Sequence, residues 1–412
     1  MTDAASDPFG LLDPGFRADP YPAFARLRSE APVHYSEVWG CWVITRHDDV
    51  TACFRDDRLS ADRASSYAAK LPPPLQAKLA PLIGNLGRWA LMKDPPDHTR
   101  LRGLVSKAFT PKLIAALRPA VDLICERELT ELERQRDEHG GFDLIASYAL
   151  TIPVLVIGDM LGLPAEHASK LKDWSAALTG FLGAASMTPE IVGAALKAVV
   201  ELESYFREQI EQRRRAPGDD LLSSLLAAHE QDDRLDEQEL LATCTMVLFG
   251  GHETTTNLIG NGVEVLLGHP EQLAWLRDDL DGRIVAAVEE LLRFESPIMR
   301  MGRVARAPIE LRDATIAAGD RVYMILAAAN RDPQAFPDPD RLDLSRADNR
   351  HLTFGHGRHF CLGAALGRLE AQLALGKLFA RFPTLRAPEG FTPTWLDNLT
   401  VRGLERLPLE AR

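Results

Sequence analysis

A long amphipathic helix with two glycines at its centre restricts the folds open to this chain. Apolar residues repeat at three- and four-residue spacing from Asp236 to Leu267, a segment of roughly 48 Å when helical. Asp236 and Glu239 form a capping-box pattern at its start, and a Gly-His-Pro sequence follows its end. Gly250 and Gly251 each cost a helix interior about 1 kcal/mol, so either another group approaches this backbone closely or the helix kinks there.

The sequence as a whole predicts a mostly α fold with minor β structure. Helical periodicity recurs in four further segments, Leu113–Arg136, Ile191–Arg215, Ile284–Arg293 and Leu362–Phe382. Alternating aromatic and β-branched residues predict one hairpin within Val33–Thr45 and a second within Glu310–Tyr323. No linker or repeat divides the 412 residues, so we expect residues 1–412 to form a single domain.

Charge and cysteine usage exclude several classes of function. Forty-seven basic residues against 59 acidic ones give a net charge of −12, which argues against a nucleic-acid partner. The five cysteines include no C-x-x-C pair, which fits a reducing cytoplasm. Met1–Asp13 lacks an export signal, and the longest apolar stretch, Tyr148–Ile157, is far shorter than the roughly 20 residues that span a bilayer. We expect a soluble, cytoplasmic monomer with no membrane partner.

The segment Phe354–Gly363 carries the most chemical information. It reads FGHGRHFCLG, a glycine-containing loop that is predicted to enter a helix at Cys361. The amide N–H groups and the positive end of a helix lower the pKa of a cysteine there, which suits either a nucleophile or a soft-metal ligand. Cys125 and Cys244 lie on apolar helical faces and are predicted to be buried as small hydrophobic residues.

This segment resembles the heme-binding signature of the cytochrome P450 family, which runs Phe, Gly, any, Gly, any, His or Arg, any, Cys, any, Gly. Its fixed positions are filled by Phe354, Gly355, Gly357, His359, Cys361 and Gly363. The resemblance implies that Cys361 is the thiolate ligand of a heme b iron and that His359 contacts a heme propionate. It also implies the cytochrome P450 fold, with small N-terminal and central sheets and the long helix over the distal face of the heme.

Further propionate-binding residues are implied by two other matches to the family. His98 and Arg102 are four residues apart on one predicted helical face and match its propionate-binding pair. Arg303 matches a propionate-binding arginine, although an isolated strand arginine is usually solvated. Buried carboxylates need such cationic or hydrogen-bonding partners.

A structural network is implied by a third match. Glu290 and Arg293 fill the family's E-x-x-R pattern, which on its own indicates only a weak surface ion pair. Arg341 lies in a segment that resembles the family's third partner, so the resemblance implies a Glu290–Arg293–Arg341 network that holds the loop before Cys361.

The glycine pair in the long helix resembles the family's (Ala/Gly)-Gly-x-(Asp/Glu)-Thr motif. By that resemblance Gly250 and Gly251 leave room for dioxygen, and Glu253 and Thr254 relay protons to it. A zinc-protease H-E-x-x-H motif is excluded because Thr256 stands where the second histidine belongs.

The resemblance implies a monooxygenase that inserts one oxygen atom from O2 into an apolar small molecule, by hydroxylation or epoxidation, in secondary metabolism. No G-x-G-x-x-G nucleotide motif is present, so electrons from NAD(P)H are expected to arrive through a ferredoxin or flavodoxin and its reductase. We expect docking on the cysteine side, at Arg100, Lys107, Lys112, Arg358 and Arg368. A peroxide-driven peroxygenase and a heme-thiolate sensor or carrier are the alternatives, and the Glu253–Thr254 pair favours the use of dioxygen over both.

Substrate contacts are expected, by position in the family, in segments that are largely apolar. They are Ser65–Leu91, the surroundings of Met187 and of Phe249, Ile298–Met301 and Asp397–Leu399. A terpenoid, macrolide, steroid or fatty acyl group fits such a lining. Arg300 has the charge to anchor a carboxylate, but a surface position is the stronger expectation for it.

Overall fold

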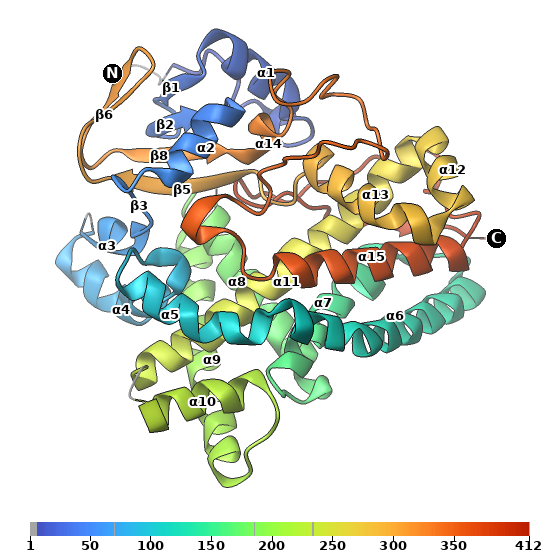
Figure 1. Cartoon of the computed structure of the whole chain (residues 1–412), viewed down its shortest axis with the longest axis horizontal. Helices are drawn as coiled ribbons and strands as arrows, with labels where there is room; N and C mark the ends of the chain where they lie inside the picture. The colour runs from blue at the N-terminus through green and yellow to red at the C-terminus, as the bar shows by residue number, and fades with distance from the viewer. Residues whose placement is uncertain (1–5, 70, 185, 233–234, 412) are drawn as a thin grey trace.

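The computed structural model describes residues 6–69, 71–184, 186–232 and 235–411. Its four longest helices are α6 (Pro111–His139), α9 (Pro189–Arg215), α11 (Glu237–Gly268) and α15 (Ala364–Arg381). In Figure 1, α15 and α6 run side by side across the front of the molecule, and α11 passes behind them. Much of the remaining chain forms shorter helices that surround these four.

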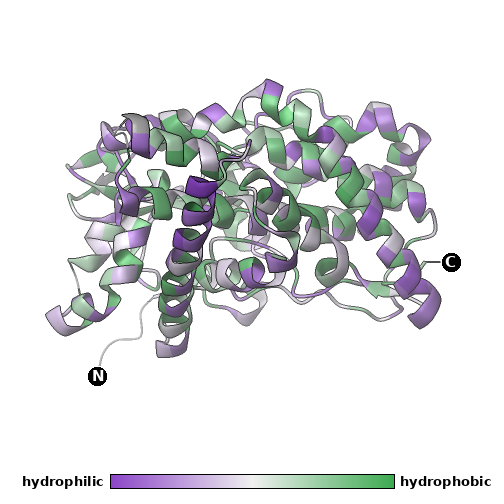
Figure 2. Cartoon of the chain, turned by 90° about the horizontal axis from the view of Figure 1, so that it is seen from below, coloured by the Kyte–Doolittle hydropathy of each residue, from purple (hydrophilic) through white to green (hydrophobic). Residues whose placement is uncertain are grey.

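The shorter α-helices connect the long ones and cover the sheet. They are α1 (Tyr21–Glu30), α2 (His47–Arg55), α3 (Arg63–Ala68), α4 (Pro73–Gly87), α5 (Asp97–Val105), α7 (Thr151–Met160), α8 (Ala168–Gly183), α10 (Leu221–Asp232), α12 (Pro270–Asp278), α13 (Leu280–Phe294) and α14 (Leu326–Ala329). Helices seen from below in Figure 2 carry hydrophilic residues on one side and hydrophobic residues on the other, as amphipathic surface helices do.

One mixed sheet, one short hairpin and one pair of short strands that are distant in sequence supply the β structure. The five-stranded sheet has the order β1-β2-β8-β5-β3, from strands β1 (Val33–Ser36), β2 (Cys41–Ile44), β3 (Leu59–Ser60), β5 (Arg300–Ala305) and β8 (Arg321–Ile325). Strands β2 and β8 are parallel, with Trp42 opposite Val322, and the other neighbours are antiparallel. The small pairs are β4 (Phe142–Asp143) with β9 (Pro408–Leu409), and β6 (Ile309–Leu311) with β7 (Ala314–Ile316).

The structure confirms the mostly α prediction and the five long helical segments. The hairpin within Val33–Thr45 is confirmed as β1 and β2. The second hairpin is wrong in extent, because it ends at Ile316 and Tyr323 lies in β8 of the large sheet. Strand β8 joins the sheet of the N-terminal hairpin, whereas β6 and β7 form a separate sheet, since alternation marks a strand but does not identify its partner.

Helix α11 is the central element of the fold. Its capping box is confirmed, because the Glu239 amide donates to Asp236 Oδ1 at 2.6 Å and the Asp236 amide donates to Glu239 Oε2 at 3.2 Å. It packs against α7, α8, α9, α13 and α15 and is buried on most sides, which explains its apolar composition. Within the described residues, no helix is both long and apolar enough to cross a membrane.

Candidate functional site

The loop that ends at Cys361 is held by its own backbone and by α2, whose Arg55 Nε donates to His356 Nε2 at 2.9 Å. The Gly355 amide donates to the Leu352 carbonyl at 2.7 Å, and the Cys361 amide donates to the Phe354 carbonyl at 2.8 Å. Gly355 and Gly357 have φ values of 71° and 69°, which favour glycine. Helix α15 begins only at Ala364, with Gly363 as its N-cap, so the cysteine precedes the helix instead of opening it.

Cys361 is the one exposed cysteine among the five, and Cys125 and Cys244 are buried as predicted. The protein around Cys361 is nevertheless dense enough that burial raises the pKa of its thiol, against the lowering effect of the Gly363 amide and of Arg102 and Arg368. The amide at the helix start thus lowers this pKa as expected, but burial outweighs it. A coordinated metal ion is the group that deprotonates a thiol in such surroundings.

The side chains expected at the heme propionates meet beside this loop. The rings of His98, on α5, and His359 lie 4.1 Å apart between centroids. Burial, Arg303 and His98 lower the pKa of His359 to about 3, and burial lowers that of His98. Both rings are thus neutral near pH 7. Arg102 donates to the Phe360 carbonyl at 2.7 Å and so joins α5 to the cysteine loop.

Arg303 shows that this region suits an anionic group. Its side chain on β5 is only 3% exposed, and burial together with Arg63 lowers its pKa to about 9. Its guanidinium donates to the Gly302 carbonyl at 2.8 Å, and no carboxylate within the described residues forms an ion pair with it. His359 Nε2 is also buried without a hydrogen-bond partner. A buried guanidinium without a carboxylate partner and a buried imidazole nitrogen without a hydrogen-bond partner fit the two carboxylates of a heme.

The two glycines of α11 have different surroundings. A Cβ placed on Gly250 would meet no atom within 4 Å, whereas one on Gly251 would lie 2.8 Å from Ile157 Cδ1 of α7. Gly250 therefore leaves open space, as expected for a dioxygen-binding position. The same expectation for Gly251 is wrong, because the missing side chain there makes room for Ile157.

Glu253 and Thr254 follow on the same helix. Thr254 Oγ1 donates to the Gly250 carbonyl at 3.3 Å. Burial raises the pKa of Glu253 to about 7, so its carboxyl group exchanges protons near neutral pH. His252 beside it is fully buried, and burial lowers its pKa to about 4.

The predicted ion-pair network is present with a different third member. Glu290 and Arg293 form a fully buried pair at 2.8 Å, and Arg346 Nε lies 3.2 Å from Glu290 Oε2. Arg341, the expected partner, instead pairs with Asp343 near the surface and contributes only its carbonyl oxygen to Arg293. The identification of Arg341 is therefore wrong, because a motif in a loop does not specify which side chain turns inward. Asn349 completes the network with a hydrogen bond to Glu290 Oε2 at 3.1 Å.

Several cations expected on the docking surface are already paired. Arg368 donates to Glu289 at 2.6 and 2.9 Å and lies 4.4 Å from the Phe354 ring, so it supports the cysteine loop. Burial alone would raise the pKa of Glu289, but hydrogen bonds from Arg368 and His351 lower this pKa to about 2. Arg358 pairs with Asp57, and Arg100 with Glu239. Sequence spacing does not reveal such pairs between distant segments.

One aromatic contact joins two segments expected to meet the substrate, and a second joins one of these segments to α8. The Trp89 ring, after α4, lies 4.9 Å from that of Phe249 on α11. Tyr67 of α3 lies 6.4 Å from Phe181 of α8. The surface position expected for Arg300 is wrong, since it is buried with its guanidinium 4.1 Å from the Tyr323 ring and 5.1 Å from the Trp39 ring.

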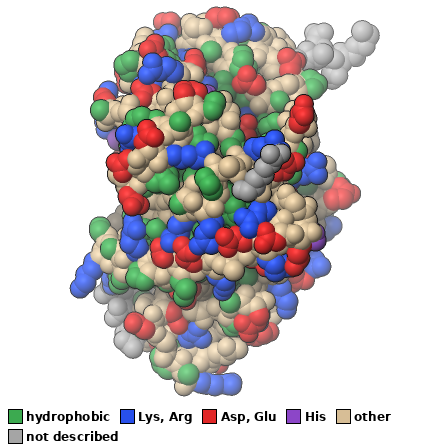
Figure 3. All heavy atoms as spheres, turned by 90° about the vertical axis from the view of Figure 1, so that its right-hand side faces the viewer, with side chains coloured by type: hydrophobic (Ala, Val, Ile, Leu, Met, Phe, Trp, Pro, Cys, Tyr) green, Lys and Arg blue, Asp and Glu red, His purple; other side chains and the backbone are tan. Residues whose placement is uncertain are grey.

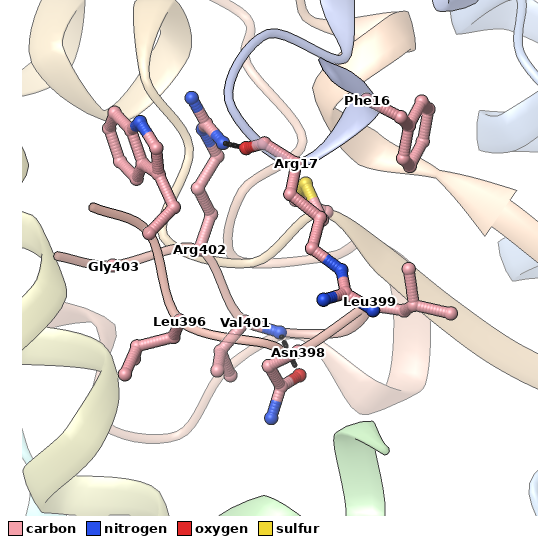
Figure 4. A pocket seen from close by; sticks show the side chains of 10 residues that line it. Phe16, Arg17, Leu396, Asn398, Leu399, Val401, Arg402 and Gly403 are labelled. Carbon is pink, nitrogen blue, oxygen red and sulfur yellow. Dashed lines mark hydrogen bonds between the residues drawn. The ribbon is translucent and has the colours of Figure 1, made fainter. Parts of the chain in front are cut away.

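The C-terminal loop is fastened to the end of α8 by Asn398. The Asn398 amide donates to the Thr179 carbonyl at 3.0 Å and accepts from the amides of Thr400 and Val401 at 2.8 and 2.9 Å. Figure 4 shows Asn398 with Leu399 and Val401 around a cavity of about 10 Å³. This cavity holds about one water molecule and is too small for a substrate.

Comparisons with known proteins agree with this arrangement. A family model described as Cytochrome P450 matches residues 74–402. The chain is 40% identical over 405 residues to Cytochrome P450 107B1 of Saccharopolyspora erythraea, with 97% of this chain and 96% of that protein covered. It is 39% identical over 414 residues to Vitamin D(3) 25-hydroxylase of Pseudonocardia autotrophica, with 99% and 98% covered. Among solved structures, P450BioI in complex with a hexadec-9Z-enoic acid ligated acyl carrier protein gives a TM-score of 0.88 at 35% identity, with 97% and 100% covered.

Proposed function

The chain belongs to the cytochrome P450 family and is a heme-thiolate monooxygenase, and from this we propose that it hydroxylates or epoxidises an apolar small molecule of secondary metabolism. The observation that supports the assignment of the site is the exposed Cys361 next to a group of buried donors that lack an anion. Heme, when bound, supplies the chemistry that activates dioxygen. Residues 1–412 together form one heme domain in this proposal.

Each residue of the site has a separate task in holding the cofactor. Cys361 binds the iron through Sγ, and Gly355 and Gly363 shape the loop and the helix start around it. His98, Arg102, Arg303 and His359 donate to the heme carboxylates, while Phe354 packs between the loop and Arg368. The buried Glu290–Arg293–Arg346 network keeps the preceding loop in place.

In this proposal, helix α11 relays protons and leaves space for dioxygen. Gly250 keeps space open where dioxygen binds, because no atom would approach a side chain there. Glu253 takes a proton from solvent and passes it inward, for which a pKa near 7 is well matched. Thr254 holds the accepting end of this relay through its hydroxyl group.

Apolar substrates are supported by the aromatic pairs Trp89–Phe249 and Tyr67–Phe181 and by the names of the relatives. Vitamin D(3) 25-hydroxylase is named for a large apolar substrate, and P450BioI holds a long-chain acyl group on its carrier protein. We assign the same broad class to this chain, a steroid-like, terpenoid, macrolide or fatty acyl compound.

Electron supply is part of the proposal. NAD(P)H reduces a reductase, and a ferredoxin or flavodoxin carries single electrons to the cysteine side. A cytoplasmic location suits five cysteines that are all free, and we propose that the chain acts there as a monomer.

The test is the absorption spectrum of the reduced holoprotein with carbon monoxide, for the wild type and for Cys361→Ala. We expect a Soret band at the far-red position typical of heme-thiolate proteins in the wild type and its loss in the variant. Cys53→Ala is the control, because Cys53 is buried near the same loop and has no part in the site. A wild-type band at the shorter, histidine-like wavelength would refute the assignment of Cys361.

A further inference from the structure

Two arginines from different elements converge on one carbonyl oxygen. Arg63 is the first residue of α3, and Arg303 lies on β5. Arg63 Nη1 is 3.4 Å from the Gly302 carbonyl oxygen, and Arg303 Nη1 is 2.8 Å from the same atom. Two guanidinium groups so close together repel each other unless an anion lies between or beside them.

No carboxylate within the described residues forms an ion pair with either arginine. Asp94, whose charge acts on Arg303, is itself held by Arg306 at 2.5 Å and by the Ala61 amide at 2.9 Å. The other guanidinium contact of Arg63 is with Met92 Sδ at 2.9 Å, and sulfur is a weak acceptor. Arg63 Nε is buried with no hydrogen-bond partner. A half-buried cation with such poor acceptors is stabilised when an external group completes its hydrogen bonds.

The backbone of β5 is adapted to this placement of Arg63. A Cβ on Gly302 would lie 3.2 Å from Arg63 Cδ and 2.8 Å from Tyr323 Cε1. Glycine at this position therefore lets the arginine side chain lie across the strand toward Arg303. A side chain at residue 302 would therefore crowd Arg63 as well as Tyr323.

We infer that Arg63 is a further binding residue for the heme carboxylates and shares them with Arg303. The inference rests on the proposed function, because it requires that heme occupies the region between Arg303 and Cys361. A heme brings two carboxylates, which are the anions that two adjacent guanidinium groups require. No family motif marks Arg63, and the sequence gives no indication of its role because its partner carbonyl is far away along the chain.

The experiment compares Arg63→Gln and Arg63→Lys with the wild type as holoproteins. One readout is the rate of heme transfer to excess apomyoglobin, and the other is the midpoint potential of the substrate-free protein. Arg58→Gln is the matched control, since Arg58 is an exposed arginine on the same segment that pairs with Asp56.

Arg63→Gln is expected to release heme at least about five-fold faster and to lower the midpoint potential, because losing a nearby positive charge favours the ferric state. Arg63→Lys keeps the charge, so its heme release and potential should lie between those of the wild type and of Arg63→Gln. Arg58→Gln should match the wild type in both. If both Arg63 variants match the wild type in heme release and potential, the inference is overturned. Failure of the proposed function is distinguishable, since the wild type would then lack the far-red carbon monoxide band.

Discussion

Glu253 is the side chain of the site whose protonation changes nearest to neutral pH. Burial raises its pKa from 4.5 to about 7, so the folded protein binds this proton more tightly than the unfolded chain does. Ionising the carboxyl group of Glu253 therefore weakens the folded state as the pH rises from about 4.5 to about 7, by about 3 kcal/mol. The wild type should lose more stability than Glu253→Gln between about pH 5 and about pH 8, measured by urea unfolding of the holoprotein. Equal losses would show that the carboxyl group is not buried as described.

The same substitution should affect turnover more than binding. A glutamine cannot release a proton, and general acid–base groups contribute about 10²-fold or more. Product formation by Glu253→Gln with ferredoxin, reductase and NAD(P)H should therefore fall by about that factor, while the substrate-induced Soret shift stays unchanged. An unaltered rate would exclude Glu253 from the relay.

Arg346 and Arg341 allow a matched test of the buried network. Arg346 is 9% exposed at its side chain and pairs with the fully buried Glu290, whereas Arg341 is 67% exposed. Arg346→Gln should destabilise the protein by about 3 kcal/mol, because it removes a cation from a buried carboxylate. Arg341→Gln should cost less than about 0.5 kcal/mol. The test is to measure the free energy of unfolding of both variants in urea. Similar values would contradict the identification of Arg346 as the third member of the buried network.

At the scale of single residues, site residues could be predicted from the sequence where they belong to contiguous motifs. Cys361 and the Glu290–Arg293 pair belong to such motifs, and the structure shows the buried pair directly. Arg346, Arg63 and the pairing of Arg368 with Glu289 were not found, because their partners are distant in sequence. Which of several arginines turns inward is decided by packing around it, and a spacing pattern contains no such information.

At the level of elements, the end of α8 and the C-terminal loop act as one unit. Gly183, the last residue of α8, accepts a hydrogen bond from the Leu399 amide at 2.8 Å, and a Cβ on it would overlap the Asn398 side chain. Gly183→Ala should cost about 1 to 3 kcal/mol of stability and weaken substrate binding, because Leu399 must shift. Unfolding in urea and titration of the Soret shift test both effects.

Gly180 provides the control in the same helix. A Cβ there would meet no atom within 4 Å, so Gly180→Ala should be neutral or stabilise α8 by up to about 1 kcal/mol. If the two variants behave alike, Asn398 does not determine the position of the loop. Periodicity predicted the existence of the long helices, but contacts of this kind between a helix end and a distant loop could not be predicted from it.

At the scale of the whole molecule, charges are mixed over much of the surface. Figure 3 shows Lys and Arg side chains interspersed with Asp and Glu side chains across the middle of one face. Among the described residues of the expected docking surface, Lys107 and Lys112 form no ion pair, unlike Arg100, Arg358 and Arg368. The docking charge should therefore come mainly from these two lysines.

Lys107→Glu and Lys112→Glu should slow reduction by a ferredoxin several-fold at low salt and flatten its dependence on ionic strength, because surface charges of an interface act on the association rate. Stopped-flow reduction under carbon monoxide measures both. Lys197→Glu, on α9, is the control with the same change of charge. A salt dependence that is unchanged in both lysine variants would place the docking surface elsewhere.

The parallel pairing of β2 with β8 also bears on how the protein is made. Trp42 lies opposite Val322, which is 280 positions further along the chain and must leave the ribosome before the pair can form. At about 5 to 20 residues per second, translation takes roughly 14 to 56 s over this stretch. An isolated two-stranded hairpin such as β1–β2 is at best marginally stable in water. Strands β1 and β2 therefore lack their partner strand β8 during most of the synthesis of the chain.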